Sequence, residues 1–174
     1  MALTRLGPNQ SVNLASNVTG TLPAANGGTG ATSFTAGKIL QVVSAKKTDL
    51  FNTSSTSFVD VGLEATITPS ATSSKISVYL DTGGVTRSGV ANECARVKIL
   101  RAGSDNYGGS NIFYSTDDIP YSGVSTSFHY IDEPSSTSSL LYKVQMETRS
   151  GNSCGIIAGG SSQFASLILM EIAG

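Results

Sequence analysis

The sequence predicts an all-β protein, built as a single antiparallel β-sandwich of jelly-roll-like type that follows an extended N-terminal arm. Gly, Ser and Thr are abundant, with 19 Gly in the chain, whereas long helix-forming side chains are sparse. From Lys38 onward, short segments of alternating apolar and polar residues are separated by clusters of Ser, Thr, Gly, Asn and Pro, which is typical of a sandwich or barrel. At 174 residues, the chain is long enough for one domain with a real core and an appendage.

The first 36 residues form the predicted arm. They include Pro8, Pro23 and the run Asn26-Gly27-Gly28-Thr29-Gly30, without a sustained strand or helix period. A polar, Gly-rich segment of this kind cannot build a core alone, so it is either disordered or ordered by lying against a neighbouring subunit or a larger assembly. We therefore expect the arm in residues 1–36 and the β-sandwich in residues 37–174.

Four segments alternate cleanly, at residues 56–67, 75–81, 92–101 and 139–149. Apolar side chains fall on one face of each segment and charged or hydroxyl side chains on the other, which predicts one-sided antiparallel strands. Pro69 ends the first of them. The residues expected to face inward are Val59, Val61, Leu63, Ala65, Ile67, Ile76, Val78, Leu80, Ala95, Val97, Ile99, Leu140, Tyr142, Val144 and Met146.

Two segments are apolar at nearly every position, at residues 37–43 and 164–173. A strand that is apolar on both sides needs cover on both sides. One side can pack inside the sandwich, and the other is buried either by another layer of the same chain or by a second copy of the subunit. We predict that the C-terminal strand lines a homo-oligomeric interface through Phe164, Leu167 and Leu169.

The least regular stretch runs from residue 102 to residue 123 and predicts a long aromatic-bearing loop or a pair of very short strands. Tyrosine and asparagine on loops suit sugar recognition, since a flat ring can stack on a pyranose while amides bind its hydroxyls. Tyr107, Tyr114 and Tyr121 are therefore candidates for receptor contact. The alternative is that Phe113, Tyr114 and Tyr121 pack the loop onto the edge of the sandwich.

No set of residues predicts a catalytic or metal site, so we expect no enzyme and no cofactor. The single histidine, His129, falls on the outer side of an alternating segment, without a visible orienting group or oxyanion donors. The adjacent acids Asp117-Asp118 and Asp132-Glu133 are commoner as turn or surface residues than as a glycosidase pair, and their spacing does not match a calcium loop.

Charge and hydropathy argue against nucleic-acid and membrane partners. Only 13% of residues are charged and the formal net charge is −1, so no basic excess is available to neutralise a phosphate backbone. No apolar run approaches the roughly 20 residues of a spanning helix, and the N-terminus lacks the apolar core of a signal peptide. Cys94 and Cys154 have no metal-site spacing and are expected to be free thiols.

The segment from Asn13 to Gln41 resembles one that recurs in tail-fibre and related structural proteins of tailed bacteriophages. The family pattern is VTGTLP-x-ANGGTG before a distal domain, and the match covers Val18 to Gly30 closely, including Leu22-Pro23 and Asn26-Gly27-Gly28-Thr29-Gly30. Residues 39–81 and 164–174 resemble a β-rich domain of predicted fibre and virion proteins of phages, notably marine ones. Together the two resemblances cover most of the chain.

The resemblance implies a trimeric virion appendage for host attachment, assembled in the host cytoplasm. The arm would join the domain to other virion proteins, and host surface carbohydrate is the expected receptor class. The chain departs from a full tail fibre in having neither a long shaft nor a dedicated attachment domain. A capsid or tail decoration protein that cements the particle is therefore the alternative, and a polysaccharide-degrading tip is the third.

Overall fold

The computed structural model describes residues 38–87, 94–102, 104–114, 121–156 and 163–174. The chain divides into two compact units, Met1–Gly37 and Lys38–Gly174. The first unit lies outside the described residues. The predicted docking positions lie there: Leu22, Pro23, Asn26, Gly27, Gly28, Thr29 and Gly30.

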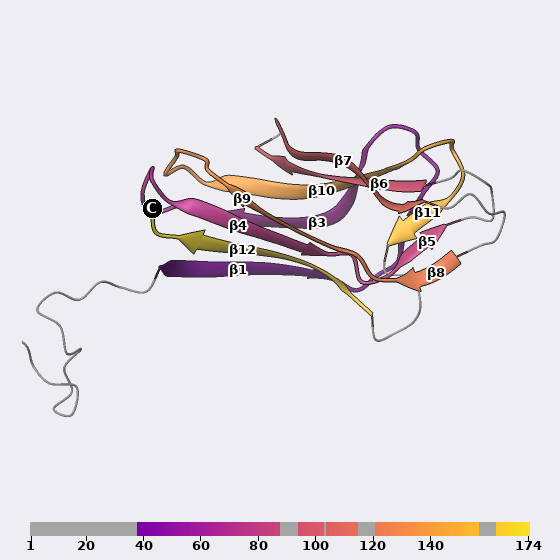
Figure 1. Cartoon of the computed structure of the whole chain (residues 1–174), viewed down its shortest axis with the longest axis horizontal. Helices are drawn as coiled ribbons and strands as arrows, with labels where there is room; N and C mark the ends of the chain where they lie inside the picture. The colour runs from indigo at the N-terminus through magenta and orange to yellow at the C-terminus, as the bar shows by residue number, and fades with distance from the viewer. Residues whose placement is uncertain (1–37, 88–93, 103, 115–120, 157–162) are drawn as a thin grey trace, which may run out of the picture. The chain divides into compact units, whose positions relative to one another are not determined.

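All regular elements of the described residues are β-strands, so the all-β prediction is confirmed (Figure 1). They form three antiparallel sheets. Sheet A has the order β1 (Ile39–Lys47), β12 (Ala165–Ile172), β4 (Lys75–Asp81), β9 (Ser127–Asp132). Sheet B has the order β2 (Phe51–Thr53), β11 (Cys154–Ile156), β5 (Val85–Arg87), β8 (Tyr121–Val124). Sheet C has the order β3 (Val59–Ile67), β10 (Leu140–Thr148), β6 (Cys94–Arg101), β7 (Ser104–Tyr114).

Sheet B continues sheet A strand for strand. β2 follows β1 in the chain, β11 precedes β12, β5 follows β4 and β8 precedes β9, and each pair holds the same position in its sheet. The two sheets are therefore one long four-stranded sheet that is interrupted along a line of breaks. We call this line the joint; its described residues include 48–50, 82–84, 125–126 and 163–164.

Counted with their continuations, the strands make eight long strands with the order 1-8-3-6 in one layer and 2-7-4-5 in the other. The first long strand pairs with the eighth, the second with the seventh, the third with the sixth and the fourth with the fifth. This is the jelly-roll arrangement, in which one long antiparallel hairpin is rolled into two facing sheets. The jelly-roll-like expectation is thereby confirmed.

The core lies between sheets A and C. Every residue expected to face inward is buried, except Val59, which is half-buried at the start of β3. Val85, Cys154 and Ile156 of sheet B extend the same core beyond the joint. Burying these apolar side chains supplies the main driving force for joining the two layers.

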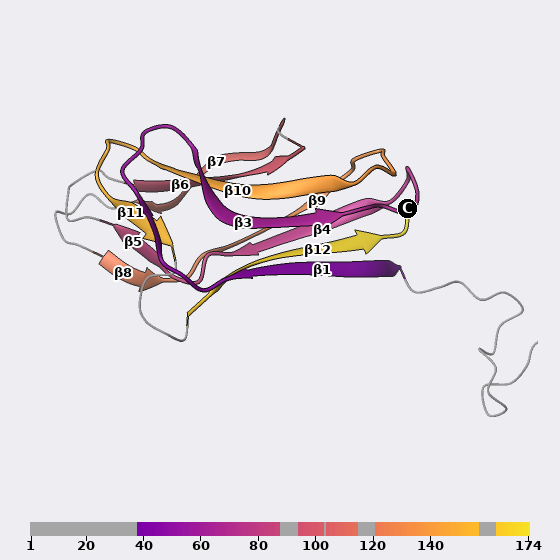
Figure 2. The ribbon, with the colours of Figure 1, turned by 180° about the vertical axis from the view of Figure 1, so that it is seen from behind.

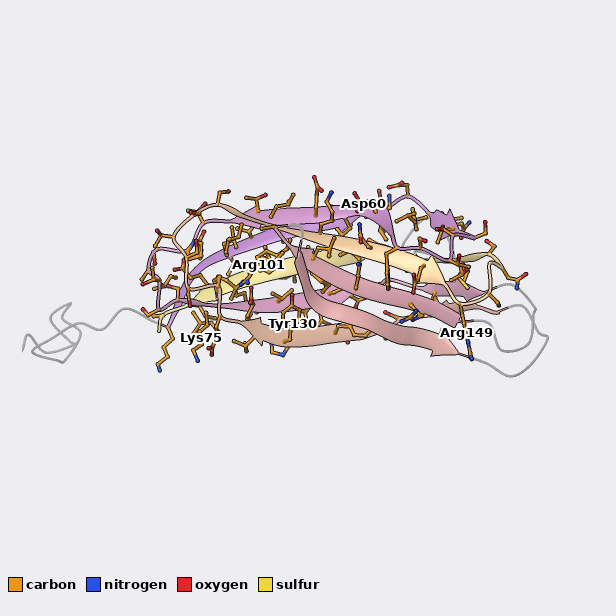
Figure 3. The ribbon with its side chains drawn as sticks, turned by 90° about the horizontal axis from the view of Figure 1, so that it is seen from above. Asp60, Lys75, Arg101, Tyr130 and Arg149 are labelled. Carbon is orange, nitrogen blue, oxygen red and sulfur yellow. The ribbon has the colours of Figure 1, made fainter. Side chains whose placement is uncertain are left out.

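A buried ion pair ties the two layers together. Asp132 on β9 accepts hydrogen bonds at both carboxylate oxygens from one guanidinium nitrogen of Arg101 on β6, at 2.9 and 2.8 Å. The hydroxyl of Tyr142 on β10 donates to the same carboxylate. Burial, together with the hydrogen bond to Asp132, raises the pKa of Tyr142 well above its ordinary value. Figure 3 views the molecule from the side of sheet C and labels Arg101.

A second buried carboxylate, Glu171 on β12, fastens the β3–β4 loop. Its Oε1 accepts hydrogen bonds from Ser70 N, Ser70 Oγ and Ser74 Oγ at 2.6 to 2.7 Å, and its Oε2 accepts one from Gln41 Nε2 at 2.6 Å. Burial raises the pKa of Glu171, but these hydrogen bonds outweigh burial and hold the pKa at about 2. The side chain is therefore charged at neutral pH although it is buried.

One prediction about this fold was wrong. The stretch expected to be a loop or very short strands begins with β7, a single strand of 11 residues. β7 is an edge strand of sheet C, and its register with β6 shifts at three points. An edge strand with Gly108-Gly109 and a shifting register does not show clean alternation in its sequence.

Candidate functional site

The outer face of sheet A is apolar over much of its length. In β12, Leu167 and Leu169 point into the core, so the alternate residues Ile168, Met170 and Ile172 point outward and are half-buried. The strand is thus apolar on both sides, as the sequence predicted. β1, which pairs with β12 at the edge of the sheet, adds exposed apolar side chains to the same face.

Strand register arranges this face in four rows across the sheet. The first three rows are Ile39, Ile172 and Lys75; then Val42, Met170, Ser77 and Ile131; then Ser44, Ile168, Tyr79 and His129. The fourth row, next to the joint, is Lys46, Ser166, Asp81 and Ser127. Apolar side chains therefore gather mainly in the first two rows, and the fourth row has none. We call Ile39, Val42, Ile131, Ile168, Met170 and Ile172 the apolar patch.

No strand of the described residues covers the apolar patch (Figures 1 and 2). Val42 keeps 58% of its surface exposed and Ile131 keeps 45%, although they lie on opposite edge strands. Single exposed apolar residues are ordinary, but a contiguous group on a regular face marks an interaction site. β1 also presents an unpaired strand edge, which natural proteins usually protect.

The structure places the predicted interface residues in two different environments. Leu167 and Leu169 are fully buried in the core, so a partner cannot reach them. Phe164 is 46% exposed and lies at the joint, one residue before β12 begins. Leu167 and Leu169 therefore do not line an interface. The side chains of this strand that face outward are Ile168, Met170 and Ile172.

The outer face of sheet C is charged. Lys143 on β10 lies 2.8 Å from Asp60 and 4.0 Å from Glu64, both on β3. The hydrogen bonds from Lys143 and Gln145 lower the pKa of Asp60, and the bond to Asp60 raises the pKa of Lys143. Arg96 on β6 pairs with Glu147 on β10. Asp60 and Glu64 are half or more exposed, whereas Glu147 is buried beneath Arg96, so charged side chains in ion pairs cover much of this face.

The residues considered for chemistry are held in structural contacts. His129 is exposed on the outer face of sheet A, and its Nε2 lies 2.8 Å from Ser77 Oγ across the strand pair. Glu133 pairs with Lys75 at 2.6 Å, whereas its neighbour Asp132 is committed to the buried ion pair. Asp117 and Asp118 lie outside the described residues. Within the described part of the chain, no group of three or more His, Cys, Asp or Glu could hold a metal ion.

The tyrosines considered for receptor contact are on strands. Tyr107 and Tyr114 belong to β7, and Tyr121 begins β8. Their side chains lie outside the described part of the structure. Among the described residues, no helix has the length and apolar character needed to cross a membrane.

Comparisons with known proteins give only distant structural similarities. No protein-family model and no curated protein matches the chain. Among solved structures, it is similar to the infectious bursal disease virus VP2 subviral particle, with 11% identity, a TM-score of 0.40 and coverage of 76% of this chain and 37% of that one. The chain is also similar to the structure of the Gx strain of that virus, with 12% identity, a TM-score of 0.40 and coverage of 100% of this chain and 42% of that one. Dimeric latent PorU from Porphyromonas gingivalis is similar with 10% identity, a TM-score of 0.33 and coverage of 86% of this chain and 15% of that one.

This chain spans less than half the length of each of these three matched chains. Identities and TM-scores this low do not transfer a function to this chain.

Proposed function

We propose that this protein is a virion structural protein of a tailed bacteriophage, a short fibre or adhesin-type appendage displayed on the particle. The arm docks onto other virion proteins, and the β-sandwich self-associates through the apolar patch. The observation that carries this proposal is the uncovered apolar patch on a complete jelly roll. The similarity of Val18 to Gly30 to phage structural proteins supports the virion setting.

Three copies are what the resemblance of Val18 to Gly30 to phage fibre proteins implies. Four strands at a spacing of about 4.8 Å and about eight residues at about 3.4 Å give each copy a face of roughly 500 Å². Two or three copies that meet through this face bury the same area per copy, so the area is compatible with either number. We propose that three copies turn this face toward one axis.

Light scattering on the purified protein tests the self-association. The full chain and a chain beginning at Gly37 are both expected to have the mass of a trimer, because the proposed interface lies in the sandwich. A trimer of the full chain alone would assign the interface to the arm. A monomer in both cases would contradict the proposal.

The role on the particle is tested separately with a phage that lacks this protein. Intact particles that no longer adsorb to the host are expected for a fibre or adhesin. Particles that lose stability but adsorb normally would contradict this role and favour a cement protein instead. Electron microscopy of antibody-labelled wild-type particles should show copies on the virion, and their absence would contradict both roles.

A further inference from the structure

The two exposed apolar side chains of the second row lie at its opposite ends. Val42 is on β1 and Ile131 is on β9, the two edge strands of sheet A, and Met170 and Ser77 lie between them. A contact between like edges, β1 with β1, would cover Val42 and leave Ile131 in water. A contact between unlike edges, β1 of one copy with β9 of the next, covers both side chains and both strand edges.

The order of the rows along the strands fixes the direction of the copies. Apolar side chains gather mainly in the first two rows, next to the start of β1, and the fourth row has none. A two-fold axis across the strands would set the first row of one copy against the fourth row of the other, where Lys46 and Asp81 lie. An axis along the strands sets each row against the same row of the next copy, so apolar side chains meet apolar side chains.

The polar rows match in the same way when unlike edges meet. In the third row, Ser44 of one copy meets His129 of the next, so a hydroxyl meets an imidazole, and the two groups can form a hydrogen bond. In the fourth row, exposed Lys46 meets Ser127 of the next copy, which pairs with Asp81 and its carboxylate. A contact between like edges would instead set Lys46 beside Lys46, and the two charges would repel.

The width of the sheet permits a closed ring of three. Four strands at a spacing of about 4.8 Å make a side of about 19 Å, and three such sides enclose an axis about 5.5 Å from each sheet. Half the distance between two packed sheets is about 5 Å, so the side chains of three copies fill the centre. Four copies would place each sheet about 10 Å from the axis and leave an open channel.

We propose that β1 of each copy packs beside β9 of the next, with the copies pointing in one direction around an axis parallel to the strands. Val42 of one copy then contacts Ile131 of the next at each of three identical heterologous interfaces. This inference rests on the proposed function for self-association through the apolar patch, and it adds which edges of the sheet meet.

A charge exchange on the full chain tests the pairing of unlike edges. Val42→Glu and Ile131→Lys are each expected to give monomers by light scattering, because each places an unpaired charge in every interface. The double variant Val42→Glu/Ile131→Lys sets a Glu beside a Lys at every interface. It should regain the mass of the trimer, with an association constant at least about tenfold above that of either single variant.

Val42→Glu/Leu141→Lys is the matched control for the double variant. It has the same net charge, but Leu141 lies on β10 of sheet C, so it should remain a monomer. Circular dichroism shows that each variant is folded.

Cross-linking gives a second measurement that adds no charge to the interface. Val42→Cys and Ile131→Cys chains of distinguishable mass, co-expressed and treated with a short bismaleimide, should give a covalent dimer that contains one chain of each kind. Neither variant alone should give more cross-linked product than the wild-type chain.

A folded double variant that stays monomeric, without mixed dimers on cross-linking, would overturn the pairing of unlike edges. Cross-linking of the Val42→Cys chain alone, above the wild-type level, would also overturn it. In both cases a trimeric wild-type chain would still support the proposed function. A monomeric wild-type chain would overturn the proposed self-association and this pairing together.

Discussion

The outer faces of sheets A and C belong to the same sandwich, yet their surfaces are opposite in character. On sheet C, Lys143 lies between Asp60 and Glu64, and long charged side chains extend into water. On sheet A, the corresponding area carries Val42 and Met170 side by side, with no charged residue in their row. Because the two layers share one core, fold stability does not explain this difference. We propose instead that water covers one face and a protein surface covers the other.

The largest expected effect is a loss of stability on substitution in β12, and residues on the two sides of this strand should respond differently. Leu169→Ala should lower the free energy of unfolding by about 2 to 5 kcal/mol, because it leaves a cavity in the core. Met170→Ala, one residue further along, should cost about 1 kcal/mol or less within the subunit but weaken the association of subunits. Urea unfolding at two protein concentrations separates the two effects. Equal losses from both substitutions, independent of concentration, would contradict the assignment of the two sides.

A smaller effect concerns acid stability. The Glu171 pKa of about 2 lies below its ordinary value of 4.5, so its contribution to stability is fully present above pH 4.5 and is lost as the pH falls toward 2. The difference corresponds to about 3 kcal/mol for this buried group. Glu171→Gln should remove this part of the acid dependence, as measured by urea unfolding between pH 5 and about 2. Glu64→Gln, on the exposed face of sheet C, is the control and should retain it. Retention of the full acid dependence by Glu171→Gln would contradict the role of its hydrogen bonds.

Much of the fold follows from alternation in the sequence. Strands such as Val59–Ile67 and Leu140–Thr148 bury one face, so period-two patterns predict both the strand and its inward side chains. The pairing of the first long strand with the last brings distant segments together, so local pattern alone does not determine it. β7 was missed because it is an edge strand with two adjacent glycines and three register shifts, which interrupt the alternating pattern.

The interface illustrates a different limit. In a strand that is apolar on both sides, alternation does not show which side faces its own core. Glu171 makes the problem harder, because a carboxylate usually points to solvent, whereas here four hydrogen bonds hold it inside beside Leu169. Its two nearest hydroxyl donors, Ser70 and Ser74, come from a loop about 100 residues earlier in the chain, so no local signal identifies them.

A small open pocket at the joint, lined by Asp81, Gly83, Ser125, Gln163 and Phe164, was also beyond sequence reasoning. Gly83-Gly84 after Asp81 indicates a turn, which is a correct local signal. The turn lies beside Ser125 and Phe164 only because all four strands of the long sheet are interrupted at the joint. That coincidence exists only in the folded chain.

The most direct test of the central claim compares one substitution on each outer face. Val42→Glu places a charge in the apolar patch, whereas Leu141→Glu places the same charge at an exposed leucine on the outer face of sheet C. The mass measured by light scattering should fall from trimer to monomer for Val42→Glu and stay unchanged for Leu141→Glu, with both variants folded by circular dichroism. A folded Val42→Glu variant with the mass of the wild-type protein would contradict the claim that sheet A is the assembly face.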